Sequence, residues 1–197
     1  MDANLIQHMD ANLIQQLIEK AAMEKAVKLN FSFRHLTFLP PEVCELHDLE
    51  ILILRRNHLT TLPPELSKLT NLKELNLGRN QLVTVPPVIC EMTYLENLLI
   101  YGNELVELPP EIGQLVNLQS LNLWDNNLKE LPREIGSLKN LLTLTLENNN
   151  LEKLPPEIRQ LTNLMGLHLI GNHLPIPGNV LATEQQPGRI LDFCFDD

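Results

Sequence analysis

Leucine and isoleucine return along this chain at a fixed set of positions, and the whole set repeats every 23 residues. In each copy two apolar residues stand two positions apart around a variable residue. This alternation is typical of a short strand whose apolar side chains face inward. The first members of these pairs are Leu29, Leu52, Leu75, Leu98, Leu121, Leu144 and Leu167, and the second are Phe31, Leu54, Leu77, Ile100, Leu123, Leu146 and Leu169. Seven aligned copies predict seven short strands in equivalent environments.

An asparagine stands three residues after the second apolar position in every copy except the first. These residues are Asn57, Asn80, Asn103, Asn126, Asn149 and Asn172, with Arg34 at the same place in the first copy. Their amide groups can satisfy backbone groups of adjacent turns that a buried loop leaves unpaired, so we predict a structural role. A proline follows six residues later in six copies and favours the start of a short helix.

The complete pattern, L-x-x-L-x-L-x-x-N-x-L-x-x-L-P-P-E-I-x-x-L, resembles the leucine-rich repeat family over residues 26–177. The resemblance implies an α/β solenoid, a horseshoe with a concave parallel β-sheet and short convex helical or 3₁₀ segments. The 23-residue form is most similar to the intracellular Ras-group repeats. The tail from Gly171 to Phe195 also resembles the repeat-to-GTPase junction of bacterial Roco-type proteins, although the sequence contains no phosphate loop.

Both ends of such a stack need covering, because a terminal coil exposes leucines and a sheet edge. We therefore expect a capping helix at residues 1–26, seven repeats at 27–177 and a C-terminal cap at 178–197. Residues near helical spacing mark the first cap: Leu5, Ile6, Met9, Leu13, Leu17, Ile18 and Ala21. Those expected to plug the other end are Ile190, Leu191, Phe193 and Phe195. Met1–Gln7 is duplicated as Met9–Gln15, which either an artefactual second start or a functional repeat explains.

Composition adds exclusions to this picture, since the 43 leucines among 197 residues are largely the repeat itself. The formal charge of −10 argues against partners such as nucleic acid or an anionic membrane, which need Lys and Arg to neutralise phosphate. No apolar run reaches the roughly 18 residues of a membrane span, and the N-terminus lacks the order of a signal peptide. Three widely separated cysteines, Cys44, Cys90 and Cys194, predict a reduced, cytoplasmic protein without a disulfide framework.

The sequence offers no recognisable catalytic chemistry, so we expect no enzyme activity, no cofactor and no metal site. It lacks the glycine-rich phosphate loops, the H-E-x-x-H metal motif and the G-x-S-x-G nucleophile motif. His35 and His58 occupy the same repeat position in adjacent coils, but zinc needs three or four ligands and no third shares that column nearby. We expect these two, with His168 and His173, to be solvated surface histidines.

Function in such an architecture is expected at the outward strand positions, which the repeat leaves free to vary. Their charges balance, with the arginines toward the N-terminal end and Asp125 and Glu147 toward the other: the basic residues are Lys28, Arg55, Arg56 and Arg79, and the acidic ones are Glu74, Glu104, Asp125 and Glu147. Trp124, the only tryptophan, and Tyr101 face outward in neighbouring coils, which is the composition of a protein-interaction hot spot. The candidate partner-binding residues are Ile53, Arg55, Arg56, Asn76, Arg79, Leu99, Tyr101, Asn122, Trp124, Asp125 and Glu147.

We therefore predict a monomeric, non-enzymatic interaction module that binds a protein on its concave face. By analogy with the family, a small GTPase or another signalling protein is the candidate ligand. The alternative is the regulatory or substrate-recognition segment of a larger enzyme, such as a Roco GTPase or a bacterial ubiquitin-ligase effector. A repeat protein without any evolved partner is the third hypothesis.

Overall fold

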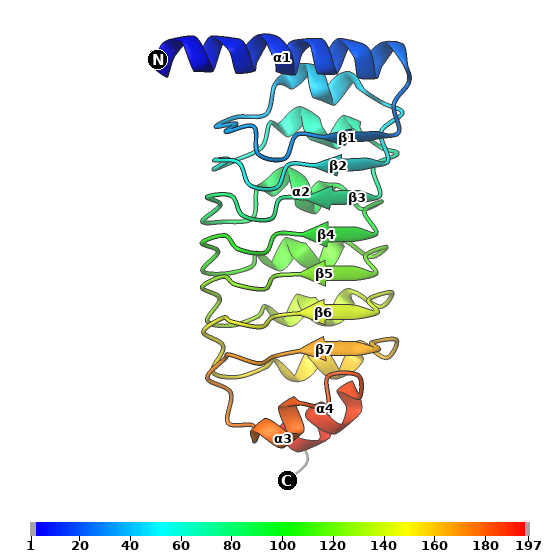
Figure 1. Ribbon diagram of the computed structural model, residues 1–197. Coiled ribbons are helices and arrows are strands. Elements are labelled where there is room, and N and C mark those ends of the chain that lie inside the picture. The colour runs from blue at the N-terminus through cyan, green and yellow to red at the C-terminus, as the bar shows by residue number, and fades with distance from the viewer. Residues whose placement is uncertain (1–2, 196–197) are drawn as a thin grey trace.

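The computed structural model describes residues 3–195, with side chains from residue 12 onward, and shows a solenoid of stacked coils (Figure 1). Seven strands form one parallel sheet in chain order. They are β1 (Lys28–Asn30), β2 (Ile51–Ile53), β3 (Glu74–Asn76), β4 (Asn97–Leu99), β5 (Ser120–Asn122), β6 (Thr143–Thr145) and β7 (Gly166–His168). Leu52 pairs with Leu29 on one side and Leu75 on the other, so each step across the sheet is one 23-residue repeat. The predicted α/β solenoid is confirmed.

Six short helices lie behind the sheet, on the opposite side of each coil from its strand (Figure 1). They are η1 (Pro41–Glu45), η2 (Pro64–Lys68), α2 (Pro87–Glu91), η3 (Pro110–Gln114), η4 (Arg133–Ser137) and η5 (Pro156–Gln160). A proline precedes each helix; Pro63, for example, has a φ of −67°, which already suits a helical start. All but α2 are 3₁₀ helices, a form usual in segments as short as these.

The interior between sheet and helices is filled by the periodic apolar residues. Leu52 in β2 and Leu54 just after it are fully buried, while the alternating residues Ile51 and Ile53 are only partly covered. The same alternation holds in the other coils except at β7, where Gly166 is buried as well as Leu167, and the apolar set predicted to face inward does so in every coil. Because the sheet has one buried face, the opposite face of each strand is free to contact other molecules.

The repeat asparagines form a buried hydrogen-bonded ladder along the loop that follows the strands. Asn126 is typical: its Nδ2 donates to the carbonyls of Ile100 and Leu123, both at 3.0 Å. Its Oδ1 accepts from the N–H of Leu105 at 3.2 Å. These bonds join one coil to the preceding one, which confirms the predicted structural role.

Helix α1 (Ala3–Met23) lies across the N-terminal end of the stack (Figure 1) and buries Ile14, Ile18 and Ala21 against the first coil, with Leu17 partly buried beside them. The expectation that Leu13 joins this cap is wrong, because Leu13 is 39% exposed and the neighbouring Ile14 faces the core. The expected contributions of Leu5, Ile6 and Met9, and the duplicated Met1–Gln7, lie outside the side chains that the structure describes. Within residues 3–195, no helix combines the length and apolarity needed to cross a bilayer.

Helices α3 (Gly178–Leu181) and α4 (Pro187–Phe195) follow the last coil, and α4 buries Ile190 and Leu191. The expectation that Phe193 joins this plug is wrong, because its side chain is 48% exposed. On a helix of about 3.6 residues per turn, Cys194 and Phe195 fall on the same stripe as Ile190 and Leu191, whereas Phe193 lies beyond the Ile190 edge of that stripe. Cys194 and Phe195 both pack partly buried against the core.

Candidate protein-interaction surface

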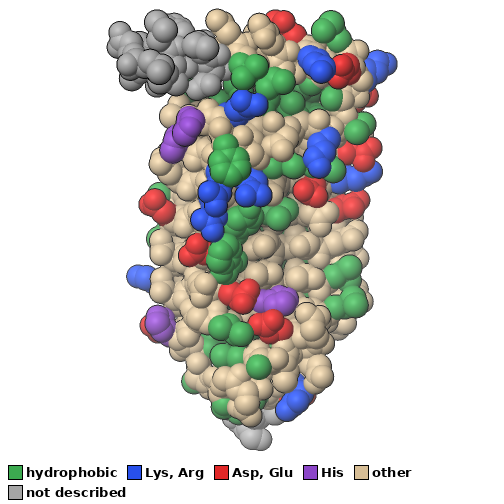
Figure 2. Space-filling view, viewed as in Figure 1, with side chains coloured by type: hydrophobic (Ala, Val, Ile, Leu, Met, Phe, Trp, Pro, Cys, Tyr) green, Lys and Arg blue, Asp and Glu red, His purple; other side chains and the backbone are tan. Residues whose placement is uncertain are grey.

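Apolar and arginine side chains gather over the sheet face toward its N-terminal end, and acidic side chains follow below them (Figure 2). The residue before each ladder position has a left-handed backbone in every coil, with φ between 52° and 78°. These seven are Phe33, Arg56, Arg79, Gly102, Asp125, Asn148 and Gly171. Glycine, and to a lesser degree Asn and Asp, tolerate this conformation, whereas it costs about 1–2 kcal/mol for other residues. Large side chains therefore occupy a strained position in the first three coils, which is a feature of functional sites.

Phe33 and two arginines form the first part of this surface. The guanidinium carbons of Arg55 and Arg56 lie 5.5 Å and 5.1 Å from the centre of the Phe33 ring, within cation–π range. The Phe33 side chain is 55% exposed. The Nε of Arg55 is buried and has no hydrogen-bond partner among the described residues. Both guanidinium groups thus rest against one aromatic ring, and no described carboxylate lies within 4.0 Å of either.

Tyr101 and Trp124 form the second part, one coil apart. Their ring centres are 6.0 Å apart with the planes tilted by 33°, and the guanidinium carbon of Arg79 lies 5.7 Å from the Trp124 ring centre. The Tyr101 ring occupies the space beside Gly78 where a side chain would otherwise stand, since an added Cβ there would meet three of its ring atoms. Gly78 therefore allows Tyr101 to lie flat against the preceding coil. We call Phe33, Arg55, Arg56, Arg79, Tyr101 and Trp124 the arginine–aromatic cluster.

The remaining apolar and amide candidates support or line this cluster. Ile53 and Asn76 line a hollow of about 440 Å³ together with Phe33 and Arg55. The Oδ1 of Asn122 accepts from the backbone N–H of Trp124 at 3.1 Å, as that of Asn76 does from Gly78 at 3.0 Å. These amides therefore fix the backbone beneath the cluster, and Leu99 adds a partly buried apolar side chain on β4.

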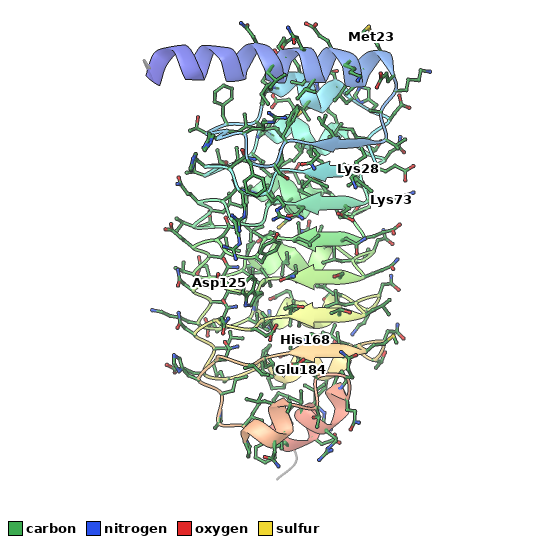
Figure 3. All side chains as sticks on the ribbon, viewed as in Figure 1. Met23, Lys28, Lys73, Asp125, His168 and Glu184 are labelled. Carbon is green, nitrogen blue, oxygen red and sulfur yellow. The ribbon has the colours of Figure 1, made fainter. Side chains whose placement is uncertain are left out.

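Asp125 and Glu147 stand apart from the arginines. No ion pair within 4.0 Å joins them to Arg55, Arg56 or Arg79 among the described residues. Figure 3 shows Asp125 at the end of the loop beside the strands, several coils below the top of the sheet. The structure thus brings the predicted arginines and aromatics together and keeps the predicted carboxylates separate from them.

Two features of the structure are not among those predicted from the sequence. Phe33 was not singled out, although it shares a repeat position with Arg56 and Arg79. A second amide ladder precedes the strands: Asn71 Nδ2, for example, donates to the carbonyl of His47 at 2.9 Å. Its members recur every 23 residues, which was the available signal: Asn71, Asn117, Asn140 and Asn163, with Tyr94 in the remaining coil.

The histidines divide into two kinds. His35 and His58 are exposed and stacked, with Nδ1 of the first 3.3 Å from Nε2 of the second. His168 is not a solvated surface histidine as expected, because its Nδ1 lies 2.8 Å from a carboxylate oxygen of Glu184 and its side chain is only 20% exposed (Figure 3). The segment between α3 and α4, which repeat periodicity does not describe, supplies that carboxylate. Residues 3–195 contain no group of three or more His, Cys, Asp or Glu side chains placed to hold a metal ion.

The buried thiols are poor candidates for nucleophilic chemistry. Burial raises the pKa of Cys44 and of Cys90 to about 11, and neighbouring glutamates act in the same direction. Both thiols are therefore overwhelmingly protonated at neutral pH, and a thiol must ionise before it can attack. Their place in the core accounts for them as small apolar side chains.

Solved structures similar to this chain are repeat proteins from several settings. A leucine-rich repeat protein of Leptospira interrogans is 32% identical (TM-score 0.54), with 88% of this chain and 55% of that one matched. The leucine-rich repeat domain of the type III effector XopL is 30% identical (TM-score 0.76; 86% and 62%). The ectodomain of the Arabidopsis thaliana receptor kinase GASSHO1/SCHENGEN3 is 33% identical (TM-score 0.60; 75% and 21%). The chain thus spans less than two thirds of each of these relatives.

Sequence families agree with the structures, although no curated protein matches the chain significantly. A leucine rich repeat model matches residues 25–82 and 47–105, and a leucine-rich repeat region model matches residues 108–182. Stacked repeats of this kind present an extended concave surface that serves as a protein-interaction module. From these matches and the fold, the chain belongs to the leucine-rich repeat family.

Proposed function

We propose that this chain is a non-enzymatic module that binds a protein partner on its concave face, with the arginine–aromatic cluster at the centre of the contact. The observation that carries the proposal is the pairing of Tyr101 with Trp124 on the outer face of the sheet, with Arg79 over the indole ring. Core packing does not require these side chains there, since the inward positions are filled by leucine. Trp, Tyr and Arg are the residue types that dominate binding energy at interfaces.

Relatives support binding of a protein ligand. The GASSHO1/SCHENGEN3 ectodomain was solved in complex with Casparian strip integrity factor 2. For the present chain, family analogy favours a small GTPase or another signalling protein as the partner, and a monomeric module in the cytoplasm. Light scattering on the purified chain and fractionation of the source cell test the last two points.

The proposal is tested by crosslinking and pulldown from the source cell, followed by affinity measurement with the captured protein. We expect Trp124→Ala and Tyr101→Ala each to weaken binding by about 2 kcal/mol, roughly 30-fold. Val116→Ala, which also truncates an exposed apolar side chain but lies in the loop before β5, is the matched control and should bind like wild type. Binding that is unchanged in both aromatic variants, with folding intact, would contradict the proposal.

The alternative function is a regulatory or substrate-recognition segment within a larger enzyme, of the Roco GTPase or ubiquitin-ligase effector kind. The similarity of this chain to the leucine-rich repeat domain of the type III effector XopL favours this alternative. Sequencing the transcript beyond the codon for Asp197 distinguishes the two, because a catalytic domain in the same reading frame would support the alternative.

A further inference from the structure

Charges at the two ends of the concave face are left without partners inside the molecule. Arg55, Arg56 and Arg79 have no carboxylate within 4.0 Å in residues 3–195, and Asp125 and Glu147 have no cation at that distance. The arginines lie in the second and third coils, and Asp125 and Glu147 lie in the fifth and sixth. Two further outward carboxylates, Glu74 and Glu104, stand in the third and fourth coils, also with no cation within 4.0 Å among the described side chains. The third and fifth coils are separated by the one that carries Gly102 at the shared repeat position.

The fold pairs charges readily where opposite signs meet in adjacent coils. Lys68 Nζ lies 2.8 Å from a carboxylate oxygen of Glu45, and Lys73 Nζ lies 2.8 Å from one of Glu50. Both pairs join residues 23 positions apart, outside the arginine–aromatic cluster. The repeat geometry therefore permits ion pairs between coils, and the charges of the concave face are unpaired because of which residues stand next to them.

Strained backbone shows that these side chains are held at a cost. Arg56 and Arg79 have φ values of 55° and 58°, at a position where two other coils carry glycine. Both guanidinium groups rest on aromatic rings, which orients them without neutralising their charge. A ligand carboxylate could therefore bond to these guanidinium groups without first displacing an internal partner.

The distance between the basic and acidic ends of the face predicts how far apart the complementary charges of the ligand lie. Neighbouring strands are about 4.8 Å apart, so the backbones of the third and fifth coils are about 10 Å apart and those of the second and sixth about 19 Å. The Arg79 side chain spans part of the shorter distance, because its guanidinium group rests on the Trp124 ring of the fifth coil. An extended peptide advances about 3.3 Å per residue, so these distances correspond to about three to six residues.

We infer that the partner presents an extended segment of mixed charge along the concave face. Its acidic side chains bind Arg55, Arg56 and Arg79, and its basic side chains, about three to six residues away, bind Asp125 and Glu147. The inference rests on the proposed function and names the chemistry of the partner. A continuous polyanion such as single-stranded nucleic acid fits less well, because it would pass over Asp125 and Glu147.

Selection of a displayed library of random 12-residue peptides against the purified chain tests this inference. We expect enriched peptides to combine Asp or Glu with Lys or Arg at this separation. Arg79→Glu should weaken their binding at least tenfold, and a peptide with its acidic residues changed to lysine should bind that variant better than it binds wild type. Lys129→Glu, an exposed lysine outside the cluster, makes the same change in net charge and should leave affinity unaltered.

The other outcomes separate the inference from the proposed function. Peptides that depend on Trp124 but are indifferent to Arg79→Glu would overturn the mixed-charge inference and leave concave-face binding intact. A selection that yields no concave-face peptide would also overturn the inference, since such segments are present in the library. Peptides unaffected by both Trp124→Ala and Arg79→Glu would bind elsewhere and contradict the proposed function too.

Discussion

Asn126 connects the fold to the site, because it follows Trp124 by two residues and belongs to the buried ladder. In Asn126→Ala the N–H of Leu105 loses its acceptor. The carbonyls of Ile100 and Leu123 each lose one donor and keep another, because Asn103 and Asn149 also donate to them at 3.1 Å and 3.0 Å. The substitution thus creates one orphaned donor and two weakened acceptors, and it also removes the longer 3.4 Å bond from Asn126 Nδ2 to the carbonyl of Trp124, which keeps the N–H of Gly102 as a donor.

The expected destabilisation follows from this inventory. An orphaned buried N–H costs about 1–3 kcal/mol, and each lost hydrogen bond to a carbonyl that keeps a second donor costs about 0.5–1.5 kcal/mol. The sum is about 2–6 kcal/mol, a large part of the roughly 5–15 kcal/mol that stabilises a typical domain. The neighbouring coils lose their tie at the site of Trp124, so its fluorescence should also change.

Urea unfolding followed by circular dichroism and by Trp124 fluorescence measures this cost. Asn127→Ala is the matched control: it removes the adjacent, exposed amide and should change stability by less than about 0.5 kcal/mol. If both variants unfold at the same urea concentration, the ladder contributes nothing beyond an ordinary surface amide, and the reasoning is refuted.

Three further predictions concern backbone, core and titration. Gly102→Ala places a Cβ at a φ of 62° and should lower the free energy of unfolding by about 1–2 kcal/mol. Gly78→Ala, at ordinary φ, should mainly displace the Tyr101 ring and alter Trp124 fluorescence. Equal unfolding midpoints for Gly102→Ala and wild type would count against backbone strain at this position. Leu121→Ala should cost about 2–5 kcal/mol through the cavity it leaves, and a wild-type denaturation midpoint would contradict the inward register. Because the thiols of Cys44 and Cys90 keep their protons to about pH 11 when folded and ionise near 9.0 otherwise, stability should be full below pH 9 and fall between pH 9 and 11. A Cys44→Ala/Cys90→Ala variant should show a smaller fall over that interval, and an identical profile would exclude the thiols as its cause.

Inward positions could be predicted from the sequence because each is repeated and tightly constrained. Leu121 and Asn126 recur with the same neighbours in every coil, so one physical requirement is written many times. The burial of the leucines and the bonds of the asparagine ladder follow directly from that register. For outward residues such as Trp124, the same register predicts the position on the sheet but not the contacts of the side chain.

Contacts among the outward residues could not be predicted, because they depend on unrepeated neighbours. The Tyr101 ring packs over Gly78 because Gly78 lacks a side chain. Phe33 contacts both Arg55 and Arg56 because it lies in the first coil and they lie in the adjacent second coil. Such contacts differ from coil to coil, so the 23-residue period does not describe them. The contact between His168 and Glu184 lies beyond the last repeat, where the period no longer fixes neighbours.

Constant register between coils has a consequence for how this surface changes over time. Every neighbour across the sheet is 23 residues away in sequence, so distances along the concave face come in whole coils. Loss of the coil that carries Gly102 would bring Arg79 and Asp125 into adjacent coils, where opposite charges can meet and close the gap between the two ends. Gain of one coil would separate them by about another 4.8 Å. Recombination that adds or removes whole repeats can therefore change the length of the ligand segment that fits the concave face, in steps of one coil, while the core packing of each coil stays the same.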